Sequence, residues 1–383
     1  MLLIRQTDVY APEHLGVRDV LICADKIEAI AETIEPPYGC QVIDGTGMKL
    51  VPGLIDRHVH VTGGGGEGSF HTRAPEVNLS SLIKGGVTTV LGLLGTDGIT
   101  RSVENLIAKV KTLKEEGISA YAVSGSYGYP SITITGNLQK DIAFIDEVLG
   151  VKLALSDHRA PNLAVDELIR LGSDVRTAGM LSGKAGIVVL HMGDDVRGLE
   201  PVFEALEQTS IPVKTFQPTH VSRTEKLLAD AMKFAKMGGK IDLTCGESKQ
   251  DRLAGVLKAA KADGVPMENI TFSSDGQGSW SKYDEAGHLV KMGVSSVETM
   301  LKEVVHLVKE EGFSLEDALA FGTSNVAKAI EVYPKKGCVA AGSDADVLLL
   351  NEDLVLDTVI ARGKVMMQGE KLLVKGTYEE IEI

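Results

Sequence analysis

The sequence predicts an α/β fold: a (β/α)8 TIM barrel with a small β-sandwich domain built from both chain ends. Three observations carry this prediction. From residue 53 onward, short β-rich runs alternate with longer segments of helical periodicity, which is typical of βα units around a parallel sheet. Eight such runs can be counted, which favours a closed barrel. The flanking segments contain strand-like runs with little helical periodicity.

The expected barrel strands lie at residues 53–60, 87–93, 118–124, 151–155, 186–191, 211–216, 240–245 and 269–274. Expected helices between and after them include residues 102–116, 225–237, 249–262, 296–311 and 314–330. Flanking strands are expected at residues 20–23, 26–30, 41–45, 346–350, 358–361 and 364–367. We therefore divide the 383 residues into a barrel at residues 53–334 and a small β-domain formed by residues 1–52 and 335–383.

Composition restricts the partners of the protein. A net charge of -14 repels phosphate backbones, so we expect no nucleic acid. No apolar run reaches the length of a membrane span, and the N-terminus lacks the apolar stretch of a signal peptide. The cysteines Cys23, Cys40, Cys245 and Cys338 form no CxxC pair, which favours free thiols in a reducing cytoplasm.

The most informative segment is the first barrel strand, which ends in an HxH motif. His58 and His60 are two residues apart, so a strand places both imidazoles on one face. At the C-terminal end of a barrel strand, that face looks into the barrel mouth, where two neutral imidazoles would make half of a zinc site. Taken alone, the motif is weak, and two polar residues at a strand end would explain it.

Three further residues follow the same geometry. His191 ends the expected strand at 186–191, His220 follows the next strand by a short loop, and Asp275 follows the last one. Active sites of these barrels are built at the C-terminal ends of the strands. Scattered structural residues would have little reason to gather there, so the set favours one or two divalent cations, with zinc the leading candidate.

Lys152 lies inside the expected strand at 151–155, which should face the core. From its position alone, a lysine that extends its ammonium group from a strand end is the favoured interpretation. The alternative is functional. Burial lowers the pKa of a lysine, and the neutral amine can take up carbon dioxide to form an anionic carbamate whose two oxygens can bridge two metal ions.

Together these residues resemble the amidohydrolase superfamily. The resemblance rests on residues 51–60 (VPGLIDRHVH), the strand lysine, two later single histidines, a final Asp and residues 342–346 (GSDAD). It covers essentially the whole chain, and the order of the ligands is the same. Loop motifs at residues 63–67 (GGGGE), 126–130 (SYGYP), 151–159 (VKLALSDHR), 219–223 (THVSR) and 274–279 (SDGQGS) resemble the isoaspartyl dipeptidases within it.

The resemblance implies two zinc ions per subunit, bridged by carboxylated Lys152 and by a hydroxide. His58 and His60 would hold one ion with Asp275, and His191 and His220 would hold the other. It also implies a β-aspartyl dipeptide as substrate and a homo-oligomer, with an octamer as the expected order.

The resemblance also distributes the catalytic and binding roles. Asp275 would move the proton from the nucleophile to the departing amine, and Tyr127 would stabilise the tetrahedral oxyanion. The expected substrate-binding residues are Glu67, Gly65, Thr96, Tyr127, Arg159, Arg223 and Ser279. Without the resemblance, Tyr127 would be a loop aromatic, and Arg159 and Arg223 would form surface salt bridges.

Two alternatives compete with this prediction. Another binuclear amidohydrolase, such as a dihydroorotase-like or hydantoinase-like cyclic amidase or an N-acyl amino acid deacylase, would share the metal ligands. It should not need the set Glu67, Arg159 and Arg223. A non-catalytic oligomeric scaffold is the alternative of a different class, but such relatives typically lose metal ligands, and here all six are present.

Overall fold

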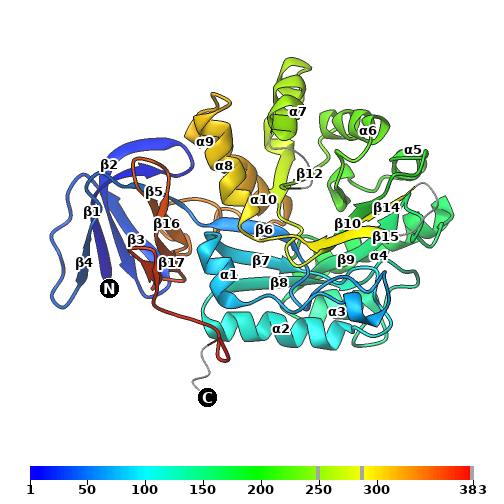
Figure 1. Ribbon diagram of the computed structural model, residues 1–383, viewed down its shortest axis with the longest axis horizontal. Coiled ribbons are helices and arrows are strands. Elements are labelled where there is room, and N and C mark those ends of the chain that lie inside the picture. Colours follow the sequence, from blue (N-terminus) through cyan, green and yellow to red (C-terminus); the bar gives the residue numbers. More distant parts are fainter. Residues whose placement is uncertain (247–250, 285–288, 380–383) are drawn as a thin grey trace.

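The computed structural model describes residues 1–246, 251–284 and 289–379, and its central element is an eight-stranded parallel barrel (Figure 1). Its strands are β6 (Leu54–Val59), β7 (Val87–Gly92), β8 (Ser119–Gly125), β9 (Val148–Leu155), β10 (Ile187–Met192), β11 (Phe216–Thr219), β12 (Ile241–Thr244) and β13 (Ile270–Ser273). They are hydrogen-bonded in sequence order, and each ladder is parallel. The predicted barrel fold is confirmed.

The barrel is nearly closed by a seam between β6 and β13. Asp56 on β6 accepts hydrogen bonds from the backbone N–H of Ser274 (3.2 Å) and from its hydroxyl. The backbone N–H of His60 then donates to the carbonyl of Gly276 (2.9 Å). These bonds tie the strand that carries the HxH motif to the segment that carries Asp275.

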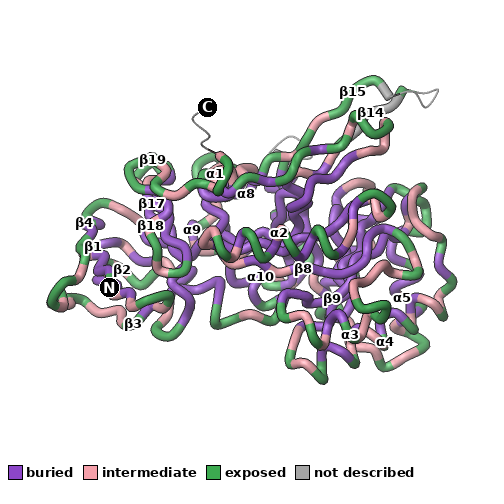
Figure 2. Tube along the Cα trace, turned by 90° about the horizontal axis from the view of Figure 1, so that it is seen from below, coloured by how far each residue is buried: buried purple, intermediate pink, exposed green. Residues whose placement is uncertain are grey.

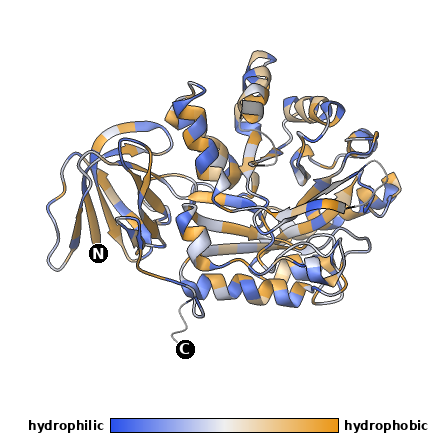
Figure 3. Cartoon of the chain, in the orientation of Figure 1, coloured by the Kyte–Doolittle hydropathy of each residue, from blue (hydrophilic) through white to orange (hydrophobic). Residues whose placement is uncertain are grey.

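Helices follow the barrel strands on the outside of the barrel. They are α1 (Leu79–Lys84), α2 (Val103–Glu116), α3 (Leu138–Phe144), α4 (Val165–Ser182), α5 (Glu200–Gln208), α6 (Glu225–Lys236), α7 (Asp251–Ala262), α8 (Thr299–Lys309), α9 (Leu315–Gly322) and α10 (Ser324–Ala329). The helix α2 shows why they form: Ser102 caps its first turn, Gly117 ends it with φ of 119°, and its apolar stripe is buried. The alternation of polar and apolar residues along α2 is visible in Figure 3.

Three expectations for the barrel need correction. The strand expected at 211–216 begins only at Phe216, because a 3-10 turn at residues 213–215 precedes it. The backbone N–H of Thr215 donates to the carbonyl of Pro212 (2.9 Å) and closes this turn. The helix expected at 314–330 is split at Thr323, whose hydroxyl donates to the carbonyl of Leu319 (2.7 Å). The helix expected at 296–311 is shorter, Thr299–Lys309. Residues 249 and 250 of the expected helix 249–262 lie outside the described residues.

The sequence did not predict a hairpin near the barrel mouth. A hairpin of β14 (Ser279–Tyr283) and β15 (Leu289–Val294) follows the last barrel strand, and Figure 2 shows it projecting from the barrel. Its first residue, Ser279, follows the end of β13 by six residues, and its hydroxyl donates to Glu67 Oε2 (3.0 Å). The start of the hairpin therefore adds a polar side chain beside Glu67.

The two flanking segments combine into a second sheet. It contains β1 (Leu2–Tyr10), β2 (His14–Cys23), β3 (Lys26–Ala31), β4 (Gln41–Asp44), β5 (Lys49–Pro52), β16 (Val347–Leu350), β17 (Leu356–Ala361), β18 (Lys364–Gln368) and β19 (Lys371–Leu372). The antiparallel pair β5–β16 joins the two ends of the chain. This sheet encloses its own buried cluster, which includes Ile4, Ile22, Val347 and Ile360, as the small β-sandwich domain requires.

The predicted domain limits, 1–52, 53–334 and 335–383, stay a prediction.

Within the described residues, every helix is too short or too polar to cross a bilayer.

Candidate metal centre and active site

The centre of the site is built on β6 and β9. His58, His60 and Lys152 are buried, with side chains that face the barrel interior. Lys152 Nζ lies 3.0 Å from His58 Nε2. Burial lowers the pKa of Lys152 to about 7, although the charges of Asp275 and Asp242 act in the opposite direction. A neutral amine is therefore accessible at this position near neutral pH.

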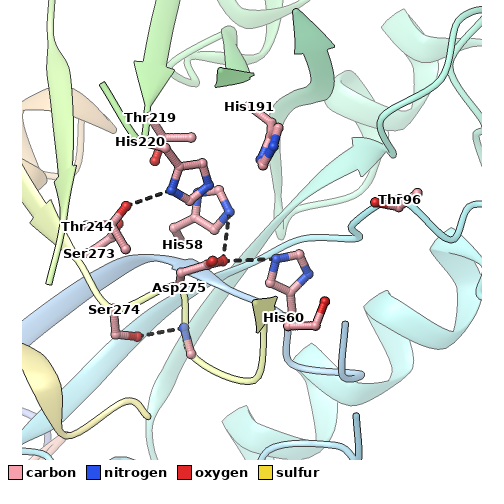
Figure 4. Close-up of polar contacts among 12 residues, drawn as sticks. His58, His60, Thr96, His191, Thr219, His220, Thr244, Ser273, Ser274 and Asp275 are labelled. Carbon is pink, nitrogen blue, oxygen red and sulfur yellow. Dashed lines mark hydrogen bonds and ion pairs between the residues drawn. The ribbon is translucent and has the colours of Figure 1, made fainter. Parts of the chain in front are cut away.

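Asp275 and His220 complete a group that could hold a metal ion. Asp275 Oδ1 lies 3.1 Å from His60 Nε2 and 3.5 Å from His58 Nε2 (Figure 4). One ligand atom each from His58, His220 and Asp275 lie within 4.8 Å of one another. Both His220 (φ 61°) and Asp275 (φ 52°) adopt the left-handed conformation just after their strands. These sharp turns are costly for residues other than glycine and are typical of functional sites.

His191 lies beside this group rather than within it. Its ring centroid is 4.7 Å from that of His220, and its Nδ1 lies 2.7 Å from the Tyr127 hydroxyl. In the pairing of β10 with β9, Val189 lies opposite Lys152. His191 is two residues later on β10, so it is on the same face as Val189 and nearer to the barrel mouth. Figure 4 shows its ring pointing toward the same space as the rings of His58 and His220.

The electrostatics of the site favour neutral imidazoles. Burial holds the pKa values of His58, His191 and His220 well below the ordinary range. The charge of Lys152 adds to this effect at His58, and the charge of Arg223 adds to it at His191 and His220. A neutral imidazole keeps a lone pair available for a metal ion. Burial also raises the pKa of Tyr127, so its hydroxyl keeps its proton and can donate a hydrogen bond.

The donor set fits a divalent cation. Imidazole nitrogens and a carboxylate oxygen are zinc ligands, and Asp275 Oδ1 is buried without a hydrogen bond from any described residue. Its neighbours are ring nitrogens of His58 and His60, and a cation shared by these ligand atoms would satisfy the buried oxygen. His220 is held from its other side, because its Nδ1 lies 2.6 Å from Thr244 Oγ1. Such outer partners normally orient metal-binding histidines.

A second group of polar side chains lies on the loops around the barrel mouth. Glu67 accepts hydrogen bonds from Thr96 Oγ1 (3.1 Å) and Ser279 Oγ (3.0 Å). Arg159 Nη1 lies 3.3 Å from Glu67 Oε1 and 3.4 Å from Thr96 Oγ1, and its guanidinium stands 5.2 Å from the Tyr127 ring centroid. Five predicted binding residues are thus linked through direct contacts.

Arg223 reaches the same group from the loop after β11. Its Nη1 lies 3.0 Å from His191 Nε2 and donates to the carbonyl of Met192 (2.8 Å). Gly65 has a different explanation from the one expected. Its φ is +79°, and a Cβ there would lie 2.4 Å from the carbonyl oxygen of Thr72, so the turn itself requires glycine. Its contact with substrate stays a prediction.

Sequence reasoning missed Asp157 and Thr244. Asp157 belongs to a motif at residues 151–159 that was singled out, but only its lysine and arginine were given roles. The structure places its carboxylate against Arg159 and His191. Thr244 carries no sequence signal, because a threonine in a buried strand is ordinary.

Among the described residues, the remaining histidines lie away from the metal group. His14 pairs with Asp8 in the small domain, and His71 and His158 are exposed. His306 is half-buried on α8, and His288 lies outside the described residues.

Comparison with known proteins identifies the class that this fold and site define. The model of the amidohydrolase family matches residues 50–366, so the chain belongs to the amidohydrolase family. It is also similar over its whole length to the beta-aspartyl dipeptidase of Fervidobacterium islandicum AW-1, whose crystal structure contains a beta-Asp-Leu dipeptide. The two chains are 42% identical with a TM-score of 0.91, covering 97% of this chain and 98% of that one. The predicted resemblance to the isoaspartyl dipeptidases is confirmed.

Other similarities are more distant or partial. The dihydropyrimidinase of Brevibacillus agri NCHU1002 has a TM-score of 0.66 at 18% identity, covering 98% of this chain and 96% of that one, which shows a shared fold alone. The dihydroorotase of Listeria monocytogenes serotype 4a (strain HCC23) is 34% identical over 150 residues, or 38% of this chain. That match spans only 34% of the length of the dihydroorotase.

Proposed function

We propose that the protein is a zinc-dependent hydrolase that cleaves the isopeptide bond of β-aspartyl dipeptides. The observation that carries the proposal is the linked set Glu67, Thr96, Arg159 and Ser279 beside the metal-binding group. A β-aspartyl dipeptide has one free amine and two carboxylates, so it needs both an acidic and a basic partner. The similarity to the Fervidobacterium enzyme over 98% of that chain supports the same substrate class.

We further propose that two zinc ions are held by His58, His60, His191, His220, Asp275 and a carboxylated Lys152. The depressed pKa of Lys152 supports carbamate formation, because only the neutral amine reacts with carbon dioxide. Carboxylation would also replace a buried cation by an anion next to His58, which suits metal binding. Bound zinc lowers the pKa of water and polarises a carbonyl oxygen.

The protein groups then divide the remaining work. Asp275 would accept a proton from the attacking water and deliver it to the amine that leaves. The protonated Tyr127 hydroxyl can donate a hydrogen bond to the oxygen on which negative charge develops, an effect worth about 3 kcal/mol per donor in other enzymes. Its contact with His191 keeps the hydroxyl beside the metal-binding group (2.7 Å).

Substrate recognition follows from charge. Glu67 would bind the free α-amine, with Thr96 and Ser279 fixing its carboxylate from two sides. Arg159 and Arg223 would bind the substrate carboxylates, for which a guanidinium offers paired donors. The backbone at Gly65 would approach the bound dipeptide.

Cytoplasmic location and a homo-oligomer, with an octamer as the specific order, belong to the same proposal. They rest on the pattern of cysteines and on the resemblance.

A comparison of substrates tests the proposal against its nearest rival. The partial identity with dihydroorotases favours a cyclic amidase as the second candidate. We expect the purified, zinc-loaded protein to hydrolyse β-Asp-Leu and to leave dihydroorotate and hydantoin unchanged. Turnover of a cyclic amide without turnover of β-Asp-Leu would contradict the proposal. Metal analysis that finds no bound zinc, together with no hydrolysis, would support a scaffold instead.

A further inference from the structure

Asp157 is an acidic side chain in the active site to which the proposed function assigns no role. It follows β9, and only 5% of the residue is exposed. Its Oδ1 accepts hydrogen bonds from the backbone N–H and the Nε of Arg159, both at 2.8 Å, and its Oδ2 accepts from Nη2 at 2.8 Å. Two parallel bonds between a carboxylate and a guanidinium are among the strongest and most directional polar contacts in proteins.

This pairing determines which edge of Arg159 is presented to the site. Because Asp157 occupies the edge formed by Nε and Nη2, the opposite nitrogen, Nη1, is directed toward Glu67 and Thr96. The planar group also stands over the Tyr127 ring, at 5.2 Å from its centroid. A flexible side chain with several rotamers is thereby held in a single orientation.

The surroundings of the pair agree with this geometry. The Asp157 carboxylate and the Arg159 guanidinium are opposite charges in direct contact (2.8 Å), and the carboxylate is almost fully buried. Water therefore screens this contact less than it screens an ion pair on the surface.

We propose that Asp157 is a positioning residue that holds Arg159 in the orientation that binds the dipeptide, and that it thereby sets substrate affinity without touching the reacting atoms. The inference rests on the proposed function. Asp157 has one other contact in the site, because its Oδ2 lies 3.3 Å from His191 Nε2. A test must therefore separate an effect through Arg159 from an effect through the metal-binding group.

A double-mutant cycle makes this separation. Asp157→Ala, Arg159→Met and the double variant would be assayed with β-Asp-Leu, and the zinc content of each would be measured. We expect Asp157→Ala to raise KM about tenfold with kcat close to wild type, since a charge-assisted contact is lost. In the Arg159→Met background the same change should have little further effect, because the group it positions is gone. Asp157→Asn keeps an acceptor at Oδ1 and should lie between wild type and Asp157→Ala.

Asp195 offers a matched control. Its Oδ1 accepts the backbone N–H of Arg197 (2.9 Å), which is the same local turn with an arginine two residues later, but in an exposed loop. Asp195→Ala should leave KM, kcat and zinc content unchanged.

The outcomes are distinct. Additive effects of Asp157→Ala and Arg159→Met on KM would overturn the inference, and so would a loss of zinc in Asp157→Ala, which would place its role at His191. In both cases wild-type hydrolysis of β-Asp-Leu would leave the proposed function intact. If the zinc-loaded wild-type protein failed to cleave β-Asp-Leu, the proposed function and this inference would fail together.

Discussion

The active site has two halves that are built in different ways. The metal half consists of side chains on barrel strands or just after them, such as His58, Lys152 and Asp275, which are almost fully buried. The substrate half consists of Glu67, Arg159 and other loop side chains that are only partly buried and hold one another through hydrogen bonds. In the proposed function, the barrel strands supply the metal ligands, whereas the loops supply the groups that bind the substrate. This division explains how one fold can serve many substrates.

The largest effect is expected in the metal half. Lys152→Ala removes the proposed bridge between the metal ions and leaves a cavity next to His58. We expect kcat to fall by about a thousandfold or more, on the scale of losing a main electrostatic contribution to catalysis. Zinc content should fall as well, and added short carboxylic acids should restore part of both by supplying the missing carboxylate. Wild-type turnover in Lys152→Ala would show that no carbamate bridge is needed.

Arg223→Met tests the substrate half. The proposed function assigns Arg223 to a substrate carboxylate, so its loss should raise KM for β-Asp-Leu by about 10- to 100-fold, the scale of one hydrogen bond to a charged group. Zinc content should stay at the wild-type level, because a neutral side chain of similar length replaces the guanidinium without removing a metal ligand. Unchanged kinetics would remove Arg223 from the binding site. A parallel loss of zinc would show that the two halves are not separable.

The same division explains what the sequence could predict. The strand periodicity, the HxH spacing and the position of His191, His220 and Asp275 at or after strand ends follow from regular geometry, so the barrel and five candidate ligands could be proposed from the residues. Lys152 could be proposed as a ligand only by resemblance, because its position alone favoured a lysine that extends from a strand end. The loop residues could be proposed only by resemblance, because no periodicity relates Glu67 to Arg159 or Ser279. The hairpin β14–β15 was missed as well, because it lies in the loop region after the last barrel strand, where the repeating strand–helix pattern gives no guide.

Asp157 and Thr244 were missed because their roles exist only as contacts in three dimensions. A carboxylate after a strand or a threonine within one has many ordinary explanations. Likewise, the break at Thr323 depends on where one hydroxyl donates, which the helical pattern of residues 314–330 does not reveal.

The smallest effect is expected from Thr244→Val, which sharpens the comparison within the metal half. Thr244 Oγ1 lies 2.6 Å from His220 Nδ1, so it orients the imidazole without being a ligand itself. Valine preserves the shape and removes the hydroxyl. We expect zinc affinity, measured by competition with a chelator, to fall about tenfold, as is usual for the outer partner of a metal-binding histidine. At saturating zinc, kcat and KM should return close to wild type, because no group that contacts the substrate has changed. The half-buried Thr209, whose hydroxyl donates to the carbonyl of Ala205 at the end of α5 (2.8 Å), provides a matched Thr→Val control. A loss of kcat in Thr244→Val that saturating zinc does not restore would mean that Thr244 acts on more than metal affinity.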